Sequence, residues 1–89
     1  MPAKRLELRI IMLTREERLS ADMVVVRATT GDLGVLSGRA PVSAALAVGE
    51  MRVYNGEAIQ RMKVYGGVMR VESDIMTVIT ELAEVLEDA

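Results

Sequence analysis

The chain has 89 residues, the length of one domain, and we expect a single domain over residues 1–89. It holds no cysteine and no histidine, which excludes a disulfide framework, a thiolate nucleophile, a cysteine-bound zinc and a histidine general base. Eleven basic and thirteen acidic residues give a formal charge of −2, and the only aromatic residues are two tyrosines, so we expect no nucleic-acid ligand.

Strand patterns dominate the first two thirds of the chain. Residues 6–10 (LELRI) alternate apolar and charged side chains, which is typical of a strand with one face in water. Residues 23–30 (MVVVRATT) are rich in β-branched and apolar side chains, which predicts a strand buried on both faces. Residues 51–54 (MRVY) alternate again, and Asn55-Gly56 follows as a hairpin pair in which both residues need a positive φ.

The return strand is predicted over residues 57–65, with Met62 and Val64 on one face and Arg61 and Lys63 on the other. The remaining strand signals are a bend or bulge at Gly66-Gly67, a strand over residues 68–72, a tight turn at Ser73-Asp74 and a strand over residues 75–80. Short strands at this spacing predict an all-β sandwich or barrel.

The C-terminal segment TELAEVLEDA is ambiguous. Leu82 and Leu86 are four residues apart, which permits a helical turn, but ten residues are too few to hold a helix alone in water. We therefore expect no helix longer than about two turns. The longest nearly apolar run, residues 40–48, is far shorter than a membrane span, and Glu7 and Arg9 interrupt the N-terminal apolar stretch, so we expect neither membrane insertion nor a secretory signal.

Residues 31–41 (GDLGVLSGRAP) form a glycine-rich segment with three possible roles. A phosphate-binding loop needs a Lys-Ser or Lys-Thr pair after its last glycine, and Arg-Ala stands there instead. A second interpretation is a tight chain reversal between two sheets. In the third, the glycines hold Leu33, Val35 and Leu36 near the surface for a partner.

The same segment carries a resemblance to a known family. GDLGVLSGRAPV resembles the G-[DE]-[LM]-G-x-x-P-G-H-A-P-L signature of the ε subunit of the rotary F-type ATP synthase, and VYGGVMRVESDIMTVITELAE resembles a second segment of that family, at the family spacing. The resemblance covers residues 6–84. Departures include Ser37 in place of proline, Arg39 in place of histidine and Val68 in place of an aromatic residue.

The resemblance implies a β-sandwich of two five-stranded sheets that performs no chemistry. It implies a place in the central stalk, bound to the γ subunit and resting on the ring of membrane c subunits, where the domain couples ion-driven rotation to ATP synthesis. This would be a peripheral position on the cytoplasmic side of the bacterial inner membrane. The residues that match partner-facing positions are Asp32 and Leu33 for the c-ring, and Leu36, Arg39, Ala40, Pro41 and Ala44 for γ.

Two further expectations concern activity. The family's inhibitory C-terminal helical hairpin would follow residue 89, so we expect this chain to assemble and couple without inhibiting, and to bind neither ATP nor another cofactor or metal. An enzyme would need a nucleophile–base pair or a carboxylate dyad, and no catalytic residue can be named. The alternative function is a generic all-β adaptor that binds an unrelated protein.

Overall fold

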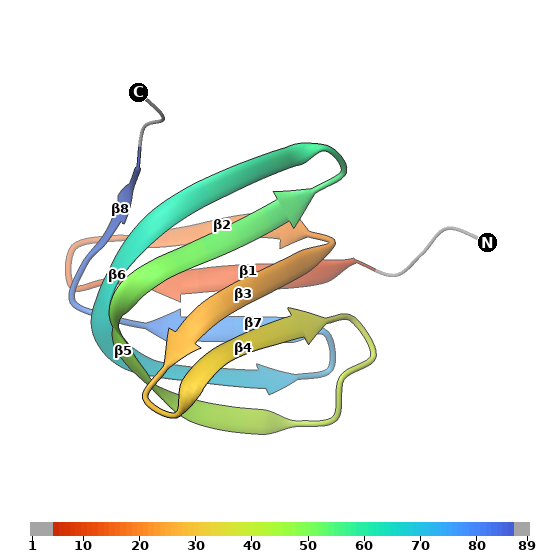
Figure 1. The fold of residues 1–89 in the computed structure, drawn as a ribbon, viewed down its shortest axis with the longest axis horizontal. Coiled ribbons are helices and arrows are strands. Elements are labelled where there is room, and N and C mark those ends of the chain that lie inside the picture. The colour runs from red at the N-terminus through yellow and green to blue at the C-terminus, as the bar shows by residue number, and fades with distance from the viewer. Residues whose placement is uncertain (1–4, 87–89) are drawn as a thin grey trace.

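A computed structural model describes residues 5–86 and shows eight strands and no helix among them (Figure 1). In chain order the strands are β1 Leu6–Ile11, β2 Glu16–Ala21, β3 Met23–Ala28, β4 Gly31–Leu36, β5 Val42–Asn55, β6 Ala58–Glu72, β7 Ile75–Ile79 and β8 Ala83–Val85. The all-β class predicted from the sequence is confirmed.

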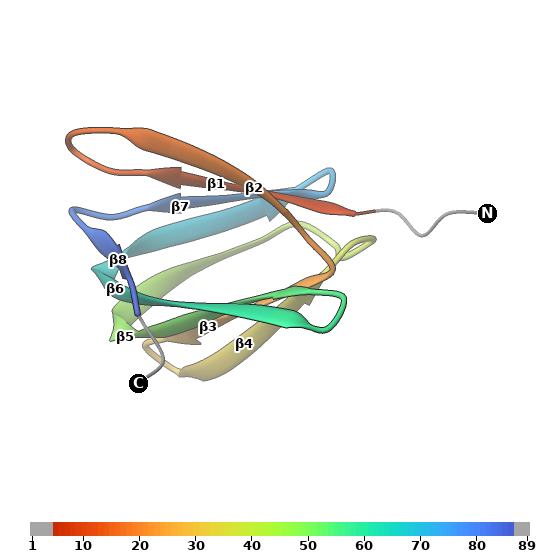
Figure 2. The same cartoon turned by 90° about the horizontal axis from the view of Figure 1, so that it is seen from above.

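The eight strands form one continuous sheet that folds over into two layers. The strand order is β2-β1-β7-β6-β5-β3-β4, and β8 pairs with β6. The long strands β5 and β6 bend, so that one half of each strand lies in the first layer and the other half lies in the second (Figure 2). The sandwich architecture is therefore as expected. The expected two separate five-stranded sheets are instead one continuous sheet, in which β5 and β6 are shared between the layers. We call the halves the β1 layer (β2, β1, β7 and the adjoining halves of β6 and β5) and the β3 layer (β4, β3, the other halves and β8).

The core lies between the layers and follows the period-two alternation of the strands. In β1, Leu6, Leu8 and Ile10 are fully buried, while Glu7 and Arg9 point outward. Four of the seven methionines are also fully buried, and these are Met51, Met62, Met69 and Met76. Flexible thioether side chains fill a core that has no large aromatic residue to occupy it.

The bend predicted at Gly66-Gly67 is present and lies where β6 passes from one layer to the other. Both glycines have positive φ, +80° and +111°. The register with β5 is the same on both sides, from Leu46 opposite Gly67 to Val48 opposite Tyr65, so the feature is a bend without an inserted residue. A Cβ at Gly67 would stand 2.0 Å from the carbonyl oxygen of Ile79, which only glycine can avoid.

Of the two turns predicted from the sequence, one is confirmed in full and the other only in part. Ser73 and Asp74 both adopt positive φ, +51° and +62°, as a tight two-residue hairpin turn requires. The Asn55-Gly56 hairpin is also present, but the prediction of positive φ at both residues was wrong. Asn55 is the last paired residue of β5, so it keeps the strand conformation and only Gly56 of the two has positive φ. The side-chain amide of Asn55 donates to the Ser20 carbonyl oxygen at 2.7 Å.

One other expectation needs correction, and two segments that the sequence left open are now assigned. The strand over residues 23–30 is not buried on both faces, because β3 alternates and its Arg27 is exposed. In the C-terminal segment, Ala83–Val85 extend as β8 and residues 80–86 form no helical turn, since β6 offers an edge with which this part of the chain can pair. Residues 16–21, with no strand signal of their own, form β2 by pairing with β1 along its whole length.

Candidate functional site

The glycine-rich segment is mostly strand, and the expectation of a single long loop was wrong. Residues Gly31–Leu36 form β4, which pairs with β3 through every residue and lies at the edge of the β3 layer. Only residues 37–41 connect it to β5. The two glycines of β4 weaken the strand signal in its own sequence. Its extended conformation comes mainly from pairing with β3 on one side.

Strand geometry divides the side chains of β4 between two faces. Leu33 packs against the core, and Val35 is 0% exposed, so the expectation that Val35 lies near the surface was wrong. Asp32 and Leu36 point outward, and Leu36 is 56% exposed. Asp32 and Leu33, both matched to c-ring positions, therefore lie on opposite faces of one strand.

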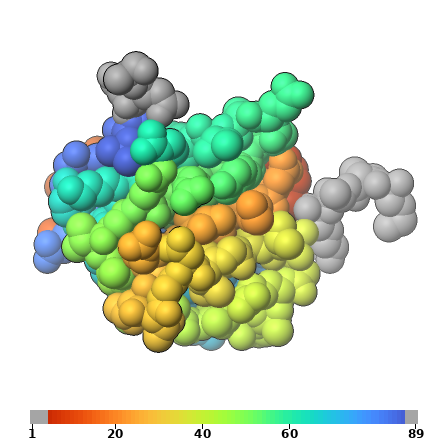
Figure 3. Space-filling view, viewed as in Figure 1, coloured from red at the N-terminus to blue at the C-terminus, as the bar shows by residue number. Residues whose placement is uncertain are grey.

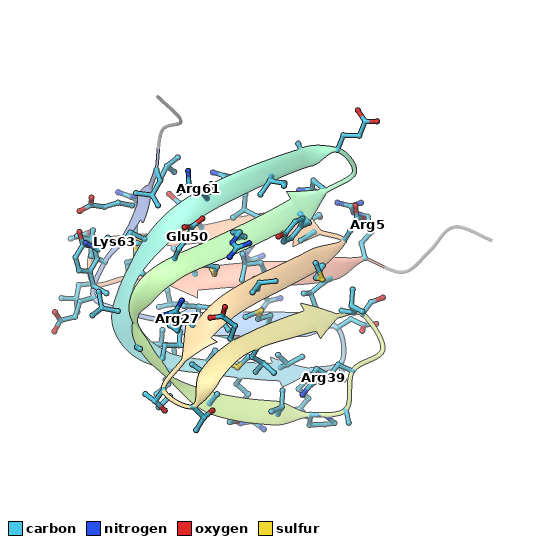
Figure 4. All side chains as sticks on the ribbon, viewed as in Figure 1. Arg5, Arg27, Arg39, Glu50, Arg61 and Lys63 are labelled. Atoms are coloured by element: carbon cyan, nitrogen blue, oxygen red, sulfur yellow. The ribbon has the colours of Figure 1, made fainter. Side chains whose placement is uncertain are left out.

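The connection after β4 is fixed at its base by a hydrogen bond. The Gly38 amide donates to Asp74 Oδ1 at 2.6 Å, which ties this connection to the β6–β7 turn. Arg39, Ala40 and Pro41 are exposed along it (Arg39 is labelled in Figure 4). Ala44, in contrast, is partly buried and packs against the core. Of the predicted γ-facing residues, Leu36 and the three loop residues are accessible, and Ala44 is the least so.

Asp32 forms an ion pair across the β3–β4 hairpin. Arg27 Nε lies 2.6 Å from Asp32 Oδ1, and the two residues are directly opposite in register. Gly49 leaves room for the stem of Arg27, because a Cβ at that position would lie 2.9 Å from Arg27 Cβ. Both side chains of the pair remain about half exposed, so the pair is available to a partner and contributes little to stability.

Four apolar side chains form a row across the outer face of the β3 layer, and we call them the apolar row. Leu36 of β4 is opposite Met23 of β3, Met23 is opposite Tyr54 of β5, and Tyr54 is opposite Ile59 of β6. Ile59 is 51% exposed. The sequence singled out only Leu36, since the other three join it through pairing between distant strands. The face is seen directly in Figure 3, over the colours of β3 to β6.

A charged cluster lies beside the apolar row. Arg52 and Arg61 are directly opposite each other in register, one row away from Tyr54 and Ile59. Both approach one carboxylate, Glu50, with Arg61 Nε at 2.5 Å and Arg52 Nε at 3.7 Å from its Oε1. Glu50 and Arg61 are labelled in Figure 4. The hydrogen bond from Arg61 and the positive charges of both guanidinium groups hold the pKa of Glu50 below its ordinary value of 4.5.

The outer face of the β1 layer has a different charge pattern. Each of its arginines has a glutamate of its own, in the pairs Arg9–Glu7, Arg18–Glu16 and Arg70–Glu72. It also carries exposed apolar side chains, with Ile11 opposite Ile79 and Ile79 opposite Val68. A shallow groove of about 470 Å³ lies beside them and is lined by Leu13, Tyr65, Gly67, Val68, Ile79, Thr80 and Glu81.

No three side chains of the described part of the chain that could ligate a metal ion come together. Within the same residues, no helix is long and apolar enough to cross a membrane. The features described above for this part of the molecule are exposed surfaces, of the kind that bind other molecules.

Comparison with known families gives these surfaces a context. Residues 6–85 match the family model described as "ATP synthase, Delta/Epsilon chain, beta-sandwich domain". The chain belongs to this family. The match spans all eight strands, so membership in the Delta/Epsilon chain family accounts for the whole described fold and not for the glycine-rich segment alone.

Curated relatives in the family are named ATP synthase epsilon chain. The chain is 39% identical to that of Anoxybacillus flavithermus over 67 residues, which cover 75% of this chain and 50% of the relative. It is 43% identical to that of Synechococcus sp. over 65 residues, 73% of this chain and 48% of the relative. The one from Granulibacter bethesdensis is 40% identical over 76 residues, 81% of this chain and 56% of the relative. The chain thus spans about half the length of these epsilon chains.

Solved structures share the fold at lower identity. A chain of the Euglena gracilis mitochondrial ATP synthase, in a structure titled OSCP/F1/c-ring, matches with a TM-score of 0.87 at 22% identity, covering 96% of this chain and 56% of that one. A chain of the Tetrahymena thermophila enzyme, in a structure titled central stalk/cring, matches with a TM-score of 0.75 at 9% identity, covering 93% and 68%. These matches confirm the sandwich fold.

Proposed function

We propose that the chain is a non-catalytic rotor subunit of an F-type ATP synthase. It links the γ subunit to the c-ring, so that ion-driven rotation of the ring is transmitted to the catalytic head. The observation that carries this proposal is the family match over residues 6–85, together with relatives at 39–43% identity that are named epsilon chain. The titles of the two structural matches, which mention a c-ring, agree with it.

The surface supports a passive role in such an assembly. A subunit that transmits torque must hold its partners at two places at once, and it needs no reactive group to do so. The apolar row with the exposed residues Arg39, Ala40 and Pro41 provides a contact for γ. Asp32, in β4 beside the β3–β4 turn, provides a second contact, for the polar loops of the c-ring, where a carboxylate favours correct register more than affinity.

In the cell, this places the protein at the surface of the energy-transducing membrane, on the cytoplasmic side of the bacterial inner membrane. A rotor subunit of this kind takes no part in the chemistry of ATP, and the contacts proposed for it require no cofactor or metal. The coupling function rests on contacts between folded proteins, which the sandwich presents from rigid strands.

Co-purification tests the proposal. The chain is expressed with an affinity tag in its own organism, membranes are solubilised in a mild detergent, and the bound proteins are identified. We expect the γ and c subunits, together with the catalytic subunits that γ carries, at fixed stoichiometry. Capture of a different protein at fixed stoichiometry, without γ or c, would support the adaptor alternative and refute the proposed function.

A further inference from the structure

We infer that Asp74 is a positioning residue for the connection between β4 and β5, and that its carboxylate holds this connection in the conformation that γ binds. We call the connection, residues 37–41, the crossing segment. The inference rests on the proposed function for the identity of the partner. It adds a residue of the β6–β7 turn, which matches no partner-facing position, to those that determine how tightly γ is held.

The crossing segment passes from one layer of the sandwich to the other. It leaves β4 at the edge of the β3 layer and enters β5 at Val42, which pairs with Val71 in the β1 layer. Residues 39–41 are exposed and belong to no strand. Gly38 has a φ of +81°, and a Cβ there would meet nothing within 4 Å. A segment of this kind needs a contact from elsewhere in the fold to keep one conformation.

Asp74 supplies such a contact from a distant part of the sequence. The Gly38 amide donates to Asp74 Oδ1 at 2.6 Å, across a sequence separation of 36 residues. A hydrogen bond from an amide to a carboxylate is stronger than one between two neutral groups. Because Gly38 directly precedes Arg39, a fixed Gly38 limits the paths that the exposed residues 39–41 can take.

The turn that carries Asp74 is itself firmly held. Ser73 and Asp74, both with positive φ, close the β6–β7 hairpin, in which Glu72 pairs with Ile75. The Asp74 carbonyl oxygen accepts a hydrogen bond from the Glu7 amide at 2.9 Å, which ties the turn to β1. The carboxylate of Asp74 therefore extends from a rigid part of the sheet, and its hydrogen bond fixes the crossing segment relative to that sheet.

Order in the crossing segment before binding affects the affinity for a partner. A partner that has to immobilise a mobile segment loses part of its binding free energy to the conformational entropy of that segment. Arg39, labelled in Figure 4, lies on this segment and is exposed. Loss of the Asp74 hydrogen bond is therefore expected to weaken γ binding through residues 39–41, without any contact between Asp74 and γ.

Two substitutions at Asp74 separate the hydrogen bond from the turn and from the charge. Asp74→Gly removes the acceptor, and glycine readily adopts the φ of +62° at this position, so the turn is retained. Asp74→Asn removes the charge but keeps an acceptor oxygen and tolerates the same φ. Circular dichroism first confirms that each variant is folded.

Affinity for the γ subunit of the same organism is then measured by titration calorimetry with the full-length protein. Asp74→Gly is expected to raise the Kd about tenfold, and Asp74→Asn to leave it within about threefold. Glu72→Gln is the control for charge, because it removes a carboxylate from the adjoining strand end and leaves the Gly38 hydrogen bond in place. It is expected to leave the Kd unchanged.

Amide hydrogen exchange, followed by NMR, shows whether the crossing segment is what changes. The Gly56 amide donates to Asp22 Oδ2 at 2.6 Å, which is the same kind of bond from another glycine of positive φ, and it serves as the internal control. In Asp74→Gly the Gly38 amide is expected to exchange about tenfold faster, while the Gly56 amide keeps its rate.

A double-mutant cycle with Arg39→Ala gives a readout that a purely structural role of Asp74 would not move. Arg39→Ala is expected to raise the Kd for γ less in the Asp74→Gly background than in the unmodified protein, because a loosened crossing segment no longer presents Arg39 in one position. Additive effects of the two substitutions would overturn the inference.

Three other outcomes would also decide against it. An unchanged exchange rate of Gly38 in Asp74→Gly, or a faster rate with unchanged affinity for γ, would overturn the inference and leave the proposed function standing. Equal weakening by Asp74→Asn and Asp74→Gly would show that the charge matters and not the hydrogen bond, and would overturn it too. Absence of γ binding by the unmodified protein would overturn both the inference and the proposed function.

Discussion

Replacement of Gly67 by alanine tests the physical origin of the bend between the two layers. A Cβ at this position would lie 2.0 Å from the carbonyl oxygen of Ile79 and 3.1 Å from Cα of Thr80, so backbone atoms of the β7–β8 connection would have to move. The φ of +111° is also one that alanine rarely adopts. The backbone conformation costs about 1–3 kcal/mol and the forced displacement about as much again, which together give roughly 2–6 kcal/mol.

That loss is a large part of the total stability. A domain of this length is expected to unfold with a free energy of roughly 4–13 kcal/mol, so a loss near the middle of the range, about 4 kcal/mol, would remove a third of it or more. For a loss of about 4 kcal/mol the fall in melting temperature is roughly 16–32 °C. The assay is thermal unfolding followed by circular dichroism, with urea unfolding to obtain the free energy.

Gly56→Ala is the matched control for the backbone conformation. Gly56 also has positive φ, +57°, but a Cβ there would meet nothing within 4 Å. Its replacement is therefore expected to cost about 1–2 kcal/mol, the conformational cost alone. If Gly67→Ala were no more destabilising than Gly56→Ala, the close approach of β6 to Ile79 would not be what requires glycine, and the reasoning would be refuted.

Further variants test the surface. Leu36→Asp should weaken γ binding by a few kcal/mol, because it places a charge in the apolar row, and unchanged affinity of the folded variant would remove Leu36 from the interface. Asp32→Lys should change stability by about 1 kcal/mol or less yet reduce ATP-driven ion pumping, and normal pumping would argue against c-ring contact. Glu50→Gln should lower stability at pH 7 but progressively less as the pH falls below 4.5, since the lowered pKa of Glu50 stabilises the fold only while its carboxylate is ionised, and a difference that did not vary with pH would disprove that linkage. Calorimetric titration of the chain with ATP should give no binding heat, because the glycine-rich segment is mostly a strand and no Lys-Ser or Lys-Thr pair follows its last glycine, and a saturable micromolar signal would revive the phosphate-loop interpretation.

The sequence predicts the parts of the fold in which local pattern and tertiary pairing agree. β1, the hairpin between β5 and β6, and the turn at Ser73-Asp74 all have their signal within a few residues. β2 and β4 do not, because both are edge strands whose order comes from one neighbour. The first half of β5 is also hidden, since its small and apolar residues show no clear alternation.

The candidate surface could be predicted only in part, for a similar reason. Recognition of the glycine-rich segment pointed to Leu36, but reading that segment as a loop concealed the alternation that buries Val35 and exposes Asp32. Met23, Tyr54 and Ile59 are far from Leu36 in the sequence, and only strand register brings them into one row. A surface assembled from four strands leaves little trace in any single stretch of sequence.

Restoration of coupling is the most direct test of the rotor role. Membrane vesicles are prepared with an F-type ATP synthase of the same organism from which the epsilon chain has been removed, and ATP-driven ion pumping is followed as this protein is added. A rotor subunit is predicted to bind in a one-to-one ratio with γ and to restore pumping, while Asp32→Lys binds but restores less. Failure of the unmodified, folded protein to bind the depleted enzyme or to restore pumping would contradict the proposed function.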